Sequence, residues 1–171
     1  LKINGFTVET PNSQLEGDEI ALKFKEWGDF GGGSFEEKVR MTVNLDPSKI
    51  DFYDIGFFAP VFRNTRQAIT LSGRVRGTVS NLKGKDLEVG FGEGSVMRGE
   101  INMEGLPDFR STFILADIQE LSTQSADLRA FQLPGGKVLQ IPSLVSKLGK
   151  ITYEGKFTGF VEDFVAYGKF S

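Results

Sequence analysis

The sequence predicts a mainly β fold, an antiparallel meander that curls on itself and carries one or two short helical inserts. A pattern that occurs twice, at residues 73–82 and 155–164, places glycines four residues apart and a valine two residues further on. Apolar and polar residues alternate through 69–79 and 151–161, which gives each strand one apolar face. Glycine-rich turns recur at regular spacing, which is typical of a meander and not of strand–helix–strand units.

The first third of the chain is expected to form strands joined by a turn and a loop. Residues 1–8 and 19–24 alternate as strands around a turn at 10–13, and 39–45 read as a half-buried strand. The loop at 27–34 contains three consecutive glycines. It lacks the lysine and hydroxyl residue of a phosphate-binding loop and the spacing of a dinucleotide fingerprint, so we reject both.

A helical region is expected next. Asp46 and Pro47 are typical N-cap and first-turn residues, and they predict one or two short helices over 47–64. The apolar residues of this region are expected to pack on the sheet as a plug. They are Ile50, Tyr53, Phe57, Phe58 and Phe62.

The rest of the chain is expected to be strand and turn, with glycine-rich turns at 83–85, 90–94 and 105–108. A short helix is predicted over 122–131 and a second helical turn over 142–148. The predicted strands cover 68–80, 85–91, 95–105, 111–118, 150–161 and 163–171.

The repeated pattern also predicts the organisation of the chain. Residues 69–150 would form a first repeat unit and 151–171 the start of a second. The chain begins at Leu1 without a basic-then-apolar leader and ends inside an expected strand. We therefore expect residues 1–171 to be a single β-rich segment of a longer protein.

Composition excludes several functions. The chain has no cysteine and no histidine, so disulfides, thiolate chemistry, cysteine-type zinc sites and Ser-His-Asp catalysis are all ruled out. Its 20 basic and 23 acidic residues lack the basic surplus of a nucleic-acid-binding protein. Its 16 phenylalanines favour either a packed core or a surface for acyl chains or other apolar ligands.

Charge is uneven, because residues 55–85 hold six basic and no acidic side chains. This block is either a solvated strand face or a patch that meets anionic head groups or an acidic partner. The head-group or partner candidates are Arg63, Arg66, Arg74, Arg76, Lys83 and Lys85.

Four stretches, 71–87, 98–101, 105–108 and 155–168, resemble the TamB branch (translocation and assembly module) of the AsmA-like superfamily, in the form found in Bacteroidota. The resemblance covers about residues 38–171 and rests on the order and spacing of plain β motifs. It implies a sheet folded lengthwise into a half-open, taco-like trough with an apolar lining. It further implies an internal periplasmic segment of a protein anchored in the inner membrane.

In that family the trough bridges the inner and outer membranes and conducts phospholipids, and an Omp85-class protein of the outer membrane is a partner. The resemblance thus implies phospholipid acyl chains as cargo, roles in outer-membrane biogenesis and protein secretion, and no cofactor. The alternating positions nominate the groove-lining candidates, each of which would equally serve a dry core. They are Leu71, Val75, Val79, Leu87, Val89, Phe91, Ile101, Met103, Phe113, Leu115, Ile151, Tyr153, Phe157, Phe164 and Phe170.

Three other readings compete with this one. Paired carboxylates at 36–37, 51 with 54, and 162–163 have no supporting catalytic motif, so we expect no enzyme. No calcium-loop pattern is present, and we expect no metal site. A closed β-barrel or sandwich that serves as a scaffold or partner-binding module fits the same strand pattern. The sheet edges distinguish the closed fold from the open trough, because an open segment has free edge strands that pair with another copy of the chain.

Overall fold

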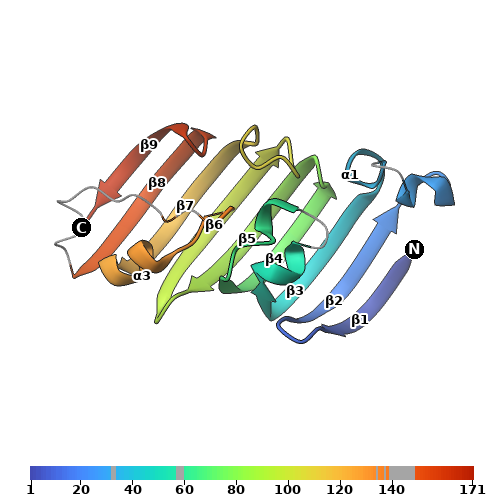
Figure 1. Cartoon of the computed structure of the whole chain (residues 1–171), viewed down its shortest axis with the longest axis horizontal. Helices are drawn as coiled ribbons and strands as arrows, with labels where there is room; N and C mark the ends of the chain where they lie inside the picture. Colours follow the sequence, from blue (N-terminus) through green and yellow to red (C-terminus); the bar gives the residue numbers. More distant parts are fainter. Residues whose placement is uncertain (32–33, 57–59, 134, 137, 139–148) are drawn as a thin grey trace.

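Nine strands form one antiparallel sheet whose spatial order follows the chain (Figure 1). The computed structural model describes residues 1–31, 34–56, 60–133, 135–136, 138 and 149–171. The strands are β1 (Lys2–Glu9), β2 (Gln14–Lys23), β3 (Arg40–Asp51), β4 (Ala68–Thr78), β5 (Asn81–Phe91), β6 (Ser95–Glu104), β7 (Phe113–Gln124), β8 (Lys150–Phe160) and β9 (Asp163–Phe170). The short helices are η1 (Trp27–Phe30), α1 (Phe35–Lys38), α2 (Phe52–Ile55), η2 (Pro60–Phe62) and α3 (Ser125–Ala130).

This topology confirms the predicted meander, because every strand pairs with its neighbours in the chain. The strands β1 and β9 occupy the two ends of the sheet (Figure 1) and do not pair with each other. The alternative of a closed barrel or two-sheet sandwich is therefore wrong for the described part of the chain. The turn predicted at 10–13 joins β1 to β2, where the Thr10 N–H donates to Ser13 O at 2.9 Å.

The predicted helix start at Asp46 and Pro47 is wrong. Both residues lie inside β3. Leu45 pairs with Gly73 and Ser48 pairs with Leu71, so β3 has one more residue than β4 between these two pairs. This surplus residue is a β-bulge, which accepts proline because the ladder there lacks a regular N–H donor. The helical region instead begins after Asp51, whose side chain caps α2 by accepting from the Tyr53 N–H at 2.8 Å.

Three other boundaries differ from the prediction. The turn expected at 83–85 lies at 79–80, so β5 already begins at Asn81. The strand β7 runs on to Gln124, which leaves α3 shorter than the helix predicted over 122–131. Cross-strand pairing explains this extension, because Ser122 and Thr123 pair with β8. The loop predicted at 27–34 contains η1, and the helical turn predicted at 142–148 lies outside the described residues.

The two faces of the sheet differ in chemistry from edge to edge. A row of cross-strand partners that spans all nine strands is wholly apolar: Ile3, Ile20, Val43, Val75, Gly84, Ile101, Ala116, Phe157 and Ala166. The adjacent row on the other side is mixed and largely polar: Lys2, Ala21, Thr42, Arg76, Lys83, Asn102, Leu115, Thr158 and Val165. We call these the apolar face and the polar face.

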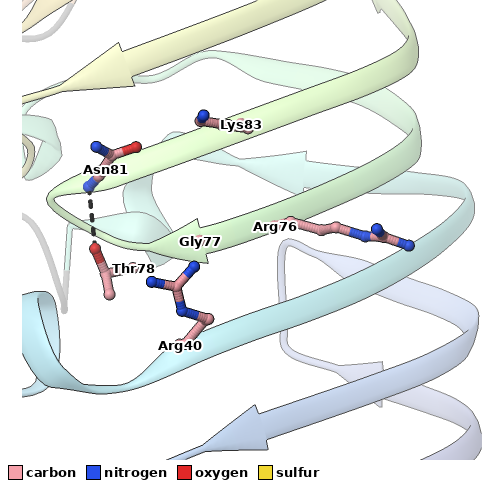
Figure 2. Close-up of a pocket in the computed structure, with 6 residues that line it drawn as sticks. All are labelled: Arg40, Arg76, Gly77, Thr78, Asn81 and Lys83. Carbon is pink, nitrogen blue, oxygen red and sulfur yellow. Dashed lines mark hydrogen bonds between the residues drawn. The ribbon is translucent and has the colours of Figure 1, made fainter.

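A row of glycines crosses the apolar face between bulges on alternate strands. Bulges interrupt β3, β5 and β7, and β2 has an extra residue between Gly17 and Glu19. The facing residues of β2, β4, β6 and β8 in this row are glycines: Gly17, Gly73, Gly99 and Gly155. A Cβ at Gly99 would lie 2.1 Å from Asp117 O, so only glycine fits this approach of neighbouring backbones. Bulges bend strands and increase their twist. The ribbons of β3, β4 and β5 are visibly curved in Figure 2.

Two helical segments cover part of the apolar face. In Figure 1 both α3 and the segment around α2 and η2 lie in front of the sheet. The α3 segment is fixed there because Ser95, on the edge of the apolar face, donates to Asp127 at 2.6 Å, and Phe91 contacts Phe131 at 5.2 Å. At the other segment Phe62 contacts Phe52, with ring centroids 5.1 Å apart. Of the predicted plug residues, Phe62 makes this contact, Ile50 lies on β3, Tyr53 is 37% exposed, and Phe57 and Phe58 lie outside the described residues.

Candidate functional site

The predicted groove residues mostly share the apolar face. Strand register places all of them there except Val79, Phe113 and Leu115. Val79 lies in the turn between β4 and β5. Phe113 and Leu115 are paired with Glu104 and Asn102 and therefore lie on the polar face, which corrects their assignment.

The neighbours of these two residues take their place. Ile114 pairs with Met103 and Gly159, and Ala116 pairs with Ile101 and Phe157, so both belong to the apolar face. Ile114 is only 8% exposed, whereas Leu115 is 44% exposed. Sequence reasoning missed them because apolar residues occur at both odd and even positions between 113 and 118. Alternation alone therefore does not decide which set faces the apolar side.

The apolar face is covered unevenly. Ile151 and Tyr153 are buried, but Phe170 at the same end of the sheet is 68% exposed. Aromatic rings line this end, where Phe157 stacks on Phe164 and Tyr153 contacts Phe170, with centroids 4.6 Å apart in both pairs. At this exposed aromatic end of the face, Phe164 and Phe170 of β9 reach solvent, while the neighbouring rings of Phe157 and Tyr153 are half-buried and buried, respectively.

The six basic candidates do not form one patch. Arg63 and Arg66 precede β4, where Arg63 donates to Gly56 O at 3.2 Å and the Arg66 guanidinium lies 4.5 Å from the Tyr53 ring. Both are therefore engaged by the α2–η2 segment.

The other four basic candidates form two cross-strand pairs on the polar face, Arg74 with Lys85 and Arg76 with Lys83. Arg74 forms an ion pair with Asp86, which lowers the pKa of that carboxyl.

A basic pocket lies beside the second of these pairs. It has a volume of about 320 Å³ and is lined by Arg40, Arg76, Gly77, Thr78, Asn81 and Lys83 (Figure 2). The lining contains three cations and no carboxylate. Sequence reasoning missed Arg40, which lies on β3 next to Met41, the cross-strand partner of Gly77.

The most strongly hydrogen-bonded carboxylates hold the fold together. Ser13, Thr10 and Asn12 donate to Asp54, which lowers the pKa of Asp54 and ties the β1–β2 turn to α2. The pKa of Asp127 is lowered because Ser95 Oγ and the Glu93 N–H donate to it.

These contacts give Asp51 and Asp54, the carboxylate pair without a catalytic motif, a structural role as helix cap and turn anchor. Among the described residues, no group of three or more acidic side chains is placed to hold a metal ion. In the same part of the chain, no helix has both the length and the apolar composition needed to cross a membrane.

Comparisons of the chain with protein-family models, with curated proteins and with solved structures found no match.

Proposed function

We propose that this chain is a non-catalytic periplasmic segment of a protein that bridges the inner and outer membranes, and that its apolar face carries phospholipid acyl chains. The observation that carries the proposal is the apolar row that crosses all nine strands without a polar interruption. A closed core needs only as much apolar surface as the helical segments cover. Here the exposed aromatic end extends beyond the helical segments, as a path for acyl chains requires.

The row of glycines and bulges supports a trough. Because each bulge bends its strand at the same level, the whole sheet would fold along a line perpendicular to its strands. The apolar face would then line a half-open, taco-like groove with the hairpin turns along its rims. Acyl chains would lie along the groove passively, and their head groups would stay at the rims, since a zwitterionic or charged group is costly to bury on an apolar wall.

The resemblance to the TamB branch extends the proposal to the whole protein. It supports an inner-membrane anchor, an Omp85-class partner in the outer membrane, and a role in outer-membrane biogenesis. The alternative is a partner-binding module without lipid, in which the exposed aromatic end of the apolar face contacts another protein.

The test is native mass spectrometry with lipid extraction on the gently purified chain. The β9 strand offers matched variants, because Phe164 and Phe170 lie on the apolar face while Val165 and Tyr167 lie on the polar face, and all four are at least half exposed. Phospholipid should co-purify with the wild type and with Val165→Asp/Tyr167→Asp, and should be lost from Phe164→Asp/Phe170→Asp. A lipid-free wild type that is compact and monomeric would favour the partner-binding module.

A further inference from the structure

We propose that the basic pocket between β3, β4 and β5 is a binding site for a phosphate group. The site is built by Arg40, Arg76 and Lys83, with Thr78 and Asn81 as neutral polar neighbours. It involves side chains of the polar face, so it is a second site that goes beyond the acyl-chain path proposed above.

The first argument is uncompensated charge. Arg76 and Lys83 stand directly opposite each other, and like charges at such a pair are unfavourable. Their outer neighbours along the same row, Thr42 and Asn102, are neutral. No carboxylate of the described chain forms an ion pair with Arg40, Arg76 or Lys83, whereas Arg74 is paired with Asp86.

The second argument is that the hairpin does not need these cations to fold. The β8–β9 hairpin repeats the β4–β5 hairpin, with Gly159 in the place of Gly77. Both glycines have positive φ, 122° and 137°, and at both a Cβ would collide with the carbonyl oxygen four residues ahead. Yet the pair that corresponds to Arg76 and Lys83 there is Thr158 and Val165. The same backbone therefore forms without the charges.

A second pocket sharpens the contrast. It has nearly the same volume, about 310 Å³, and also contains two cations, Lys156 and Lys169. Its lining includes Asp117 and Glu154 as well, and Lys156 lies 3.7 Å from Asp117. Positive charge is balanced within the lining of that pocket, whereas no acidic residue lines the basic pocket; Glu104 of β6 reaches its rim through Asn81, whose side-chain N–H donates to Glu104 at 3.5 Å.

Guanidinium and ammonium side chains from three strands line the pocket; Figure 2 draws their charged ends pointing apart, and a bound phosphate would require these long side chains to turn towards it. Arginine binds phosphate oxygens through paired N–H donors, and lysine supplies a point charge. A volume of about 320 Å³ admits a phosphate or a phospholipid head group, which share the same recognition chemistry.

The test titrates the chain with inorganic phosphate by calorimetry, and with vesicles of phosphatidylcholine with and without phosphatidylglycerol by co-sedimentation. Arg76→Gln/Lys83→Gln should weaken binding about tenfold or more, because two charge-assisted contacts are lost. The control Lys156→Gln/Lys169→Gln removes the same charge from the balanced pocket and should change binding less than about twofold. Arg40→Gln, on a separate strand, should weaken binding on its own.

Both positive outcomes support the site and identify its ligand. Binding of inorganic phosphate without vesicles indicates a free phosphate ligand, and vesicle binding that Arg76→Gln/Lys83→Gln weakens indicates a lipid head group. The proposal is overturned if the wild type binds neither probe, or if the two double variants bind equally. Lipid co-purification through the apolar face is unaffected by these variants, so the two proposals fail separately.

Discussion

At the scale of single residues, the close approach of backbones at Gly99 is the sharpest constraint in the sheet. A Cβ at this position would lie 2.1 Å from Asp117 O and 3.2 Å from the Ile118 Cα, both backbone atoms that a rotamer change cannot move. Gly99→Ala should therefore cost about 1–3 kcal/mol of unfolding free energy, as overpacking does. The measurement is urea denaturation followed by circular dichroism.

The matched control is Gly149→Ala, because no atom of the described residues lies within 4 Å of a Cβ at Gly149. This change should alter the unfolding free energy by less than about 0.5 kcal/mol. Equal losses in the two variants would mean that the glycine row is not a steric requirement, and the argument for a sheet bent along that row would lose its support.

At the scale of the strand, β7 shows how one residue of register decides which side chains meet the apolar face. Ile114 is buried there and Leu115 is exposed on the polar face. Ile114→Ala should lose about 2–5 kcal/mol, the range for a buried aliphatic side chain, and Leu115→Ala about 0.5 kcal/mol or less. Chemical denaturation of both variants measures this difference. A larger loss in Leu115→Ala than in Ile114→Ala would instead place Leu115 on the apolar face, as the sequence analysis predicted.

The strands show what the sequence could and could not predict. Alternation located the strands and the apolar face of β4 and β8, since residues 69–77 and 151–159 have apolar side chains at one parity only, whereas β9 also carries Val165 and Tyr167 at the opposite parity. It failed around Asp46 and Pro47, because a bulge shifts the parity and its proline imitates a helix start. Bulges depend on the neighbouring strand, so a single strand's residues do not reveal them.

The same distinction holds for the candidate sites. The basic stretch of residues 55–85 included Arg76 and Lys83, because both lie in one hairpin and are close in sequence. Arg40 comes from β3 and joins them only through the pairing of β3 with β4. Local pattern therefore identified part of the basic pocket, and sheet pairing supplied the rest.

At the scale of the whole molecule, the open sheet of the described residues has two edge strands that each pair on one side only, β1 and β9. Unpaired edges are templates for pairing with another chain. Thr152 and Ser171 exchange backbone hydrogen bonds of 2.9 and 3.0 Å, which sets the alternation along β9. By that alternation the N–H of Ala166 points away from β8 towards the free edge.

Ala166→Pro should therefore block edge pairing without removing a hydrogen bond to β8. We expect the wild type to associate reversibly in light scattering as its concentration rises. In Ala166→Pro the association should weaken at least about tenfold, equivalent to ~1.4 kcal/mol. Ala166→Val keeps the N–H donor and should associate like the wild type. A wild type that stays monomeric at every concentration would show that its edges are protected. A Pro variant that still associates would place the contact elsewhere, on the β1 edge or on the exposed aromatic end of the apolar face.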